Sequence, residues 1–535
     1  MTRYYQADGT PPGVWAGRGV AQLGDGALRV GEQVTEAHLE RLLGNGHDPV
    51  TGEKLGNGFG RYRTVEERIA SRLARLDPTQ RKAEREAAVA RIAAAEEAKK
   101  QRRPVVGYDF TFSVPKTVSA LWGVADAGTQ ALIAACHHAA VSEVLDFMER
   151  RVAETRVGAK NPHGGAVAQA RVCGVAATGF DHWDSRAGDP QLHTHMVVSS
   201  RVRTRDDGVW RALDGRPVHG AVVALSELYN ALLADRIAAS FGLEWEHRER
   251  GRDRNPGFEL AAVPDALAEE FSSRSAAIDQ AKEDLVAEYR ERHGRDPSPR
   301  TAIRLRQQAT LETRPRKQSR PLAESASGWR ARATAVLGQD AGTWARQAVA
   351  RAAGSRPGLL RADDVPLDLV EQLGASVMVA VGDKRATWRR WNLHAEATRQ
   401  TMHWRFATLA DRETALDLIA DAAERRSTPI TPEPAIAPAA FQRPDGTSAF
   451  RPTASTLFTS QAIWDAEERL LASSRANTAP TLELTILDAV IENPTEDGPR
   501  VATDQAEALA AIAVSGRVAD LLVGPAGAGN TTCRV

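Results

Sequence analysis

The chain contains 535 residues, of which 42% are hydrophobic and 26% are charged, as is typical of a soluble protein with several globular domains. Its 69 lysines and arginines are balanced by 69 acidic residues, which excludes a uniformly basic surface, so any nucleic acid must contact local patches. The three cysteines lack metal-ligand spacing and indicate a reducing compartment. Because the sequence has no signal-peptide core at its start and no run of 18 apolar residues, it predicts a cytoplasmic protein without a membrane span.

The N-terminal half predicts alternating helices and strands. Charged, alanine-rich residues 64–103 predict solvated helix, residues 104–113 predict a strand, and Pro115 is expected to open a helix. We then expect a long helix at residues 127–156 and strands at 165–184 and 192–204. A hairpin tip is expected at 205–215, and a helix that ends at a glycine is expected at 222–242. This order predicts an α+β domain with a central, mainly antiparallel sheet flanked by helices.

The C-terminal half is predicted to be mainly helical. Helical patterns cover residues 259–311 and 330–425, with a strand-like insert at 375–383. A Pro-rich stretch at 427–454 predicts a linker. Further helices are expected beyond it at residues 459–474, 481–492 and 503–516.

Three histidines form the richest chemical cluster. His193 and His195 are two residues apart in a predicted strand, so their imidazoles lie on one face. His182 ends the preceding predicted strand, and pairing of the two strands would bring it to the other two. Three converging imidazoles can hold a divalent ion and leave coordination positions open. A solvated His-x-His pair and a hydrolytic zinc site are alternatives, and the residues alone do not select the metal.

Candidate catalytic groups for a phosphodiester lie upstream of the histidines. Tyr4 and Tyr5 are adjacent, and a phenol that attacks a phosphodiester conserves the bond energy in a phosphotyrosine. Asp109 lies in a predicted strand, where its carboxylate could act as a base or orient a metal-ligating histidine. The alternatives are an unstructured N-terminus and an ordinary surface acid.

The sequence "GPAGAGNTT" at 524–532 departs from a nucleotide-binding P-loop. Gly524, Gly529 and Thr531 fit the pattern, and residues 518–523 predict the buried strand that precedes such a loop. Asn530 replaces the lysine that contacts the phosphates. The motif therefore predicts a degenerate loop without ATPase or helicase activity.

The tyrosine, aspartate and histidine motifs together resemble one family, the MobF-class (TrwC-like) conjugative relaxases of the HUH endonuclease superfamily. Residues 4–24 are similar to that family's Tyr-Tyr segment followed by Trp-x-Gly-x-Gly. Residues 109–122 are similar to its Asp-x-Thr-Phe-Ser-x-Pro-Lys-Ser motif, with Thr117 in place of the last serine. Residues 182–198 resemble its three-histidine metal motif, and the resemblance extends from residue 4 to roughly residue 320.

The C-terminal part resembles the opening of a superfamily-1 helicase module, with Gln505 in the place of its adenine-reading glutamine. The implied organisation is a relaxase domain at residues 1–320 and a mostly helical connecting region at 321–426. The Pro-rich linker at 427–454 and an incomplete helicase segment at 455–535 follow. We expect the chain to be truncated within that module. Tyr4 and Tyr5 match the family's second tyrosine group, so the first group is expected upstream of Met1.

The resemblance implies strand-specific nicking of single-stranded DNA at an origin of transfer, through a covalent 5′-phosphotyrosine. It implies a divalent ion, Mg²⁺ or Mn²⁺ with Zn²⁺ as an alternative, on the three histidines. Candidate DNA contacts are Lys116, Arg201, Arg203, Arg205 and Arg211. The expected partners are origin DNA, a coupling protein and accessory relaxosome proteins, and the chain is expected to be a monomer in the bacterial cytoplasm.

Three other functions are consistent with these residues. Without the first tyrosine group, the chain could be a nuclease-impaired fragment that binds origin DNA. A rolling-circle replication initiator uses the same chemistry, although the long N-terminal motif match and the helicase-like tail disfavour it. A P-loop ATPase is disfavoured by Asn530.

Overall fold

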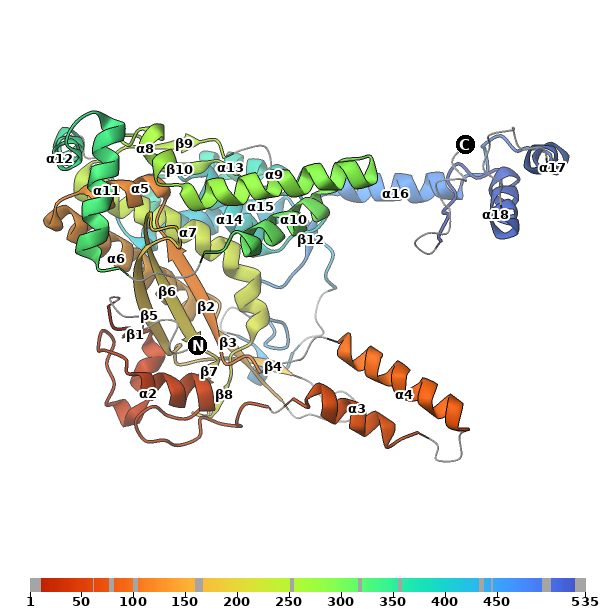
Figure 1. The fold of residues 1–535 in the computed structure, drawn as a ribbon, viewed down its shortest axis with the longest axis horizontal. Helices are drawn as coiled ribbons and strands as arrows, with labels where there is room; N and C mark the ends of the chain where they lie inside the picture. The colour runs from red at the N-terminus through yellow and green to blue at the C-terminus, as the bar shows by residue number, and fades with distance from the viewer. Residues whose placement is uncertain are drawn as a thin grey trace.

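The computed structural model describes most of the chain: residues 11–60, 62–76, 81–99, 104–158, 167–250, 255–315, 320–354, 358–432, 437–443, 446–492 and 502–524. Helices pack over a central sheet, while helices α3 and α4 and the C-terminal helices α16 to α18 project away from this body (Figure 1). The sheet and its covering helices therefore contain the core that positions the histidines.

The central sheet has four antiparallel strands in the order β1-β5-β6-β2. Their bounds are Val14–Ala16 for β1, Ala177–Asp184 for β5, Pro190–Ser199 for β6 and Gly107–Ser113 for β2. The mixed architecture with an antiparallel sheet confirms the predicted α+β class. The predicted strand at 165–184 is divided in two, because β4 ends at Arg171 and β5 begins at Ala177.

Each face of the sheet packs against different parts of the chain. Helices α6 and α7 pack against one face, where Met196 and Val198 belong to the larger core. N-terminal residues including Trp15 cover part of the opposite face, where Phe180 and Val197 are buried with them. Side chains alternate along a strand, so His182, His193 and His195 point to the same face as Phe180 and Val197.

Four two-stranded antiparallel sheets accompany the central sheet in the described parts of the chain. They pair β3 with β4, β7 with β8, β9 with β10 and β11 with β12. Their bounds are Glu154–Val157 and Ala168–Arg171, Arg201–Arg203 and Trp210–Ala212, Trp245–Arg248 and Gly257–Leu260, and Thr428–Pro429 and Phe458–Thr459. The β7–β8 turn confirms the predicted hairpin tip at 205–215.

Three helices form the layer directly on the sheet. Helix α5 (Lys116–Val124) follows Pro115 as predicted, and α7 (Gly215–Phe241) ends at Gly242, whose φ of 71° gives the left-handed cap that glycine favours. Helix α6 (Ala127–Arg151) is long and apolar enough to cross a membrane by length and composition alone, but half of that apolar window is buried in the protein. A core helix passes the same test, so α6 is weak evidence for a membrane span.

The remaining helices of the body follow in chain order. Their bounds are Asp265–Glu270 for α8, Ser273–His293 for α9, Pro299–Glu312 for α10, Leu322–Leu337 for α11, Ala341–Ala352 for α12, Leu367–Gly382 for α13, Arg390–Gln400 for α14 and Leu409–Arg425 for α15. The larger core is one cluster of buried side chains whose first member is Phe112 and whose last is Ala423. It includes side chains from α11 to α15. The predicted boundary at residue 320 thus lies within a packed body, and the domain limits stay a prediction.

The predicted strand at 375–383 is wrong, because these residues belong to helix α13. The buried positions Val370, Gly374, Val377 and Val381 recur at helical spacing and form the face that packs on α15. A Cβ atom at Gly374 would lie 2.5 Å from the Ala422 Cβ, so this glycine lets the two helices approach closely. Tertiary packing therefore outweighs the β-propensity of the valines.

The projecting segments have little buried surface. Helices α3 (Val65–Leu73) and α4 (Lys82–Glu97) pack on each other as a hairpin, which confirms solvated helix in this region. The short helix α2 spans Glu36–Leu39. Helices α16 (Gln461–Arg475), α17 (Leu484–Glu492) and α18 (Thr503–Ala513) confirm the three predicted C-terminal helices.

The predicted buried strand at 518–523 is wrong. These residues form no strand, and Leu521 and Val523 are 90% and 81% exposed. A strand requires a neighbouring strand to satisfy its backbone groups, and no described strand pairs with this segment, although the Val518 amide donates to the Ala476 carbonyl oxygen at 3.0 Å. The hydrophobic run alone was therefore an insufficient signal.

Candidate metal centre

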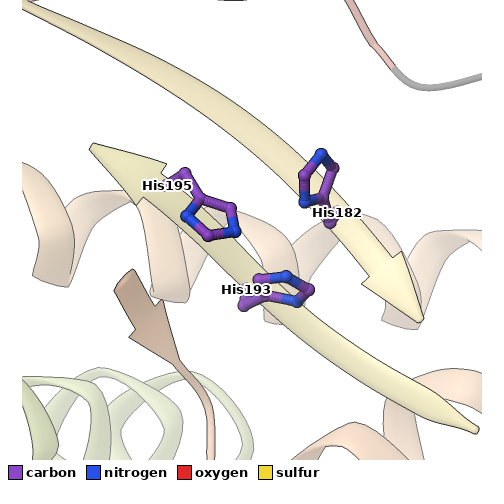
Figure 2. A group of neighbouring side chains, drawn as sticks. All are labelled: His182, His193 and His195. Atoms are coloured by element: carbon purple, nitrogen blue, oxygen red, sulfur yellow. The ribbon is translucent and has the colours of Figure 1, made fainter. Parts of the chain in front are cut away.

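The pairing of β5 with β6 brings the three predicted metal ligands together. In this register His182 lies opposite His193, and Phe180 lies opposite His195. Since the three histidines point to one side of the strand pair, their rings gather over it (Figure 2). The bend at residues 185–189 returns the chain directly, which is why residues eleven positions apart in sequence become neighbours.

The three imidazoles form a nearly symmetric triangle. Ring centroids are 5.2 Å apart for His182 and His193, 5.1 Å for His182 and His195, and 5.3 Å for His193 and His195. One nitrogen of each ring lies within 4.8 Å of the others. His182 is buried and the other two are half-buried, so the cluster opens to solvent on one side. This geometry can hold a single metal ion with free coordination positions.

Hydrogen bonds orient two of the rings. The His193 Nδ1 lies 2.7 Å from the Gln191 carbonyl oxygen, and the His195 Nδ1 lies 3.1 Å from both carboxylate oxygens of Asp109. Because a carbonyl and a carboxylate only accept, each Nδ1 carries the proton. Each Nε2 then keeps its lone pair for a metal.

Asp109 comes from the neighbouring strand β2 and faces the same side of the sheet. Strand β2 pairs with β6 so that Thr111 lies opposite His195 and Asp109 lies two residues away on the same face. The Thr111 Oγ1 is 3.1 Å from the same Nδ1 atom. Strand β2 thus contributes the side chains that hold His195, and Asp109 is next to the cluster as the sequence predicted.

A buried chain of hydrogen bonds lies on the opposite side of the same strands. The Tyr229 Oη is 2.7 Å from the His137 Nδ1, and the His137 Nε2 is 2.8 Å from the Thr194 Oγ1. Thr194 donates to the Asp181 Oδ1 at 2.5 Å, and the other carboxylate oxygen lies 2.9 Å from the His138 Nε2. Because Thr194 spends its proton on Asp181, it accepts from His137, which in turn accepts from Tyr229.

Burial keeps the imidazole of His137 neutral. It lowers the pKa of His137 to about 3 and raises the pKa of Tyr229. The side-chain hydrogen bond to Asp181 raises the pKa of His138. Our sequence interpretation missed this network, although the adjacent His137 and His138 in a predicted helix were a visible signal.

Lys116 lies near the site but is not a solvated side chain. Its Nζ donates to the Pro190 carbonyl oxygen at 3.0 Å, at the start of the strand that carries His193. Burial lowers the pKa of this lysine to about 8, while the charges of Asp189 and Glu259 oppose that shift. The side chain therefore ties α5 to β6.

The four predicted DNA-contacting arginines lie beyond the end of β6 that is farther from the histidines. Arg201 is buried, with its guanidinium carbon 4.5 Å from the Phe59 ring centre, and Arg203 donates to the Gly208 carbonyl at 2.8 Å. Arg211 forms a 2.6 Å ion pair with Asp207. Arg205 is exposed, and its Nε donates to the Val172 carbonyl oxygen at 3.0 Å.

Several predicted residues cannot be located. Tyr4, Tyr5, Gly529, Asn530 and Thr531 lie outside the described residues, and Gly524 is half-buried at the end of the last described segment. The roles of these six residues stay predictions.

Comparisons with known proteins agree with the motifs. A family model described as TrwC relaxase matches residues 1–336. The chain is 35% identical over 219 residues to an Escherichia coli protein described as multifunctional conjugation protein TraI, and 32% identical over 224 residues to the protein of that description from strain K12. These alignments cover 39% and 40% of this chain but 10% and 11% of the relatives, so the chain spans about a tenth of their length.

Two solved structures are also similar to the chain at 26% identity. Both are the conjugative relaxase TrwC in complex with OriT DNA: a metal-free form with a TM-score of 0.42 and a metal-bound form with a TM-score of 0.43. Each match covers 64% of this chain and 95% of the other. The family model matches more than half of the chain, and it includes the segments that carry the tyrosines, Asp109 and the three histidines. This protein therefore belongs to the TrwC relaxase family.

Proposed function

We propose that this chain is a conjugative DNA relaxase that nicks one strand at an origin of transfer by tyrosine transesterification. The observation that carries the proposal is the triangle of imidazoles on β5 and β6, with Asp109 hydrogen-bonded to the His195 ring. Family membership and the similarity to proteins described as conjugation proteins support the same activity. The substrate we propose is single-stranded origin DNA, and a coupling protein and accessory proteins are proposed partners in the bacterial cytoplasm.

The three histidines fit a divalent metal ion. Neutral imidazoles with fixed Nδ1 protons are nitrogen donors, which favour Mn²⁺ or Zn²⁺ over Mg²⁺. When bound, such an ion supplies positive charge to the oxygens of the scissile phosphate. His182, His193 and His195 would hold it on the open side of the sheet.

The proposed nucleophile is the phenol of Tyr4 or Tyr5, which lie outside the described residues. The phenolic oxygen forms a bond to phosphorus while the bond from phosphorus to the 3′ oxygen breaks. The phenolic proton passes to a base, and the 3′ oxygen gains a proton to become the 3′-OH. Both products are accounted for, because the 5′ phosphate stays on the tyrosine.

Asp109 has two proposed roles, and the geometry favours one. Both of its oxygens lie 3.1 Å from the His195 Nδ1, which is the arrangement of a carboxylate that orients a metal-ligating imidazole. A carboxylate held in this way is less available to take a phenolic proton. We therefore assign Asp109 to positioning His195.

The DNA contacts are proposed from exposure and charge. Arg205 is exposed and has no carboxylate partner among the described residues, so it is the best placed of the four arginines for a phosphate. Arg211 would first have to release Asp207. Lys116 is partly buried on a carbonyl oxygen, so its predicted role in phosphate binding is the weakest of the five.

Incubation with a single-stranded origin oligonucleotide and Mn²⁺ tests the function. We expect a covalent protein–DNA adduct on a denaturing gel and expect His193→Ala to abolish it, because the metal loses one of three ligands. His293→Ala removes a histidine at the end of α9, outside the cluster, and should leave the adduct unchanged.

The same assay distinguishes the other functions. Tight binding of the origin strand without an adduct would identify an origin-binding fragment rather than a nuclease. Loss of the adduct in a Tyr4→Phe, Tyr5→Phe double variant would locate the nucleophile and exclude a fragment that only binds the origin. Support of plasmid replication by this gene alone would point to a replication initiator instead.

A further inference from the structure

A cavity of about 1110 Å³ is lined by none of the three histidines, and Arg205 is the one lining residue that the proposed function uses. Its walls are the C-terminal end of α6, the β3–β4 hairpin and the start of α14. Residues 442–443 and 446–454 of the Pro-rich stretch and the two residues after it form the remaining side. The volume is comparable to that of pockets that take small-molecule ligands, about 300–1,000 Å³.

Hydrogen bonds and an ion pair hold the Pro-rich stretch against this cavity. Thr453 donates its hydroxyl to the Glu154 carboxylate at 2.6 Å, and the Arg443 guanidinium lies 3.2 Å from the same carboxylate. The backbone N–H of Gln169 donates to the Ala449 carbonyl oxygen at 2.7 Å. The described residues of the stretch predicted as a linker therefore contact the β3–β4 hairpin and close one side of the cavity.

The cavity lining carries a large excess of positive charge. Eight arginines and three glutamates of the described chain line it: Arg18, Arg150, Arg151, Arg171, Arg205, Arg390, Arg443, Arg451, Glu149, Glu154 and Glu424. Several of these arginines also pair with acids outside the lining, as Arg151 does with Asp417 at 2.9 Å. The uncompensated charge lies at the arginines that lack such an acid.

The three glutamates have their charge satisfied by other groups. Glu149 accepts from the backbone amide and the Nε of Arg18, both at 2.8 Å. Glu154 is engaged by the docked stretch, and Glu424 accepts from Arg390 at 3.1 Å. These carboxylates are therefore not available to neutralise the remaining guanidinium groups.

Three of the lining arginines, Arg171, Arg205 and Arg451, have no ion pair within the described parts of the chain. Arg451 donates to the Pro432 carbonyl oxygen, and Arg205 donates its Nε to the Val172 carbonyl oxygen at 3.0 Å. The Arg205 amide donates to the Arg171 carbonyl oxygen at 3.0 Å, and Val172 bridges Thr204 in an antiparallel pair. Arg171 and Arg205 therefore lie opposite each other, where like charges destabilise the pairing unless an anion separates them.

We propose that this cavity binds a phosphate-bearing anion, with Arg171 and Arg205 as its principal contacts. Two neighbouring guanidinium groups offer paired N–H donors that match the oxygens of phosphate, and an anion between them removes their mutual repulsion. The source of the phosphate is a free compound such as pyrophosphate or a nucleotide, or the backbone of a DNA strand. The chemistry is the same for both.

Isothermal titration calorimetry of the full chain with pyrophosphate at 0.15 M salt tests this site. We expect binding that weakens at least about tenfold in the Arg171→Gln, Arg205→Gln double variant, since two charge-assisted contacts are lost. The control is Arg346→Gln, Arg351→Gln, which removes two exposed arginines from α12, and it should bind like the native chain. Equal melting temperatures of the variants establish that both fold.

A competition experiment separates the two phosphate sources. Displacement of pyrophosphate by a non-origin oligonucleotide, with the same loss in the double variant, assigns the site to DNA backbone. Pyrophosphate that stays bound in the presence of oligonucleotide assigns it to a free anion. Failure of the native chain to bind either ligand, or equal affinity in the Arg171, Arg205 double variant, would overturn the proposal.

Discussion

At the scale of single residues, the centre depends on which ring nitrogen of each histidine is protonated. His195 is the clearest case, because Asp109 accepts at its Nδ1 from strand β2 and leaves the Nε2 lone pair free. His193 achieves the same through a backbone carbonyl oxygen. The ligands are therefore preorganised by acceptors from both a neighbouring strand and their own strand.

Asp109→Asn tests this preorganisation. An amide can present its N–H₂ group to the ring and no longer stabilises the Nδ1 proton by charge, so we expect Mn²⁺ affinity to fall about 10- to 100-fold. Calorimetric metal titration measures it, and Asp109→Glu should restore part of the loss. Asp207→Asn, in the β7–β8 turn, is the control with unchanged affinity. Equal Mn²⁺ affinity in Asp109→Asn and the native chain would contradict the role of Asp109 in positioning His195.

His394 on α14 is a second residue whose charge state matters, here for stability. It is fully buried against Phe147 and Trp391, and neither ring nitrogen has a hydrogen-bond partner among the described residues. Burial lowers its pKa to about 4, below the value near 6.5 of an unfolded chain. The unfolded chain therefore binds the proton more tightly between these two pH values, and the free energy of unfolding falls as the pH falls from 6.5 to 4.

His394→Leu should flatten that pH dependence. The neutral side chain removes a contribution of about 3 kcal/mol to the loss of stability across this interval. Urea denaturation at several pH values from 7.5 to 4.5 measures it, with the exposed His293→Leu as the control. Burial also lowers the pKa of His137, so the free energy of unfolding of the variant still depends on pH to some extent. An unchanged slope in His394→Leu would contradict the assignment.

At the scale of elements, strands β5 and β6 serve both faces of the sheet. The odd positions of β6 carry His193 and His195 to the open face, and Thr194 between them points to α6 and α7. The network through His137 and Asp181 therefore braces the backbone that spaces the two ligands. A substitution on the face that packs on α6 and α7 should therefore lower the free energy of unfolding first.

Thr194→Val tests the brace. It leaves the buried His137 Nε2–H without an acceptor and removes a donor from Asp181, so we expect a loss of about 1–3 kcal/mol in unfolding free energy. Chemical denaturation measures it. Thr414→Val, on the exposed face of α15, should change stability by less than about 0.5 kcal/mol. A loss in Thr194→Val no larger than in this control would refute the brace.

Local sequence patterns predicted the elements best where one periodicity dominates. The hairpin tip, the glycine-capped helix α7 and the strand positions of the histidines are confirmed. The segment at 375–383 was misread because β-branched residues and a helical burial stripe coexist there, and packing on α15 decides between them. Short apolar runs such as 518–523 carry no information on whether a partner strand exists.

At the scale of the whole molecule, a single core joins the sheet to helices far along the chain. Arg412 on α15 is fully buried and donates to Asp235 on α7 at 2.7 and 2.8 Å. By contrast, α16 and α18 contain no buried residue, and the apolar side chains after α18 are exposed. Ile463 at the start of α16 still packs against the core, so we expect the body to be independent of α17 and α18 only.

Removal of residues 476–535 should leave the body intact. We expect the melting temperature to change by less than about 2 °C and the nicking activity to persist, since no core residue is lost. Differential scanning calorimetry and the adduct assay measure these. Removal of residues 427–535 also deletes the contacts to Glu154 and should lower the melting temperature. A large loss of stability from the shorter deletion would show that α17 and α18 support the core.

The sequence by itself determined the chemistry of this protein: the histidine spacing, the aspartate motif and the family, because residue types and short spacings are local properties. It also determined most helices and strands, through periodicity. Only the tertiary structure decided that His182 reaches the other two ligands, that His137 braces their strands and that Arg171 faces Arg205. These relations depend on strand register and on the packing of distant segments, which no local pattern specifies.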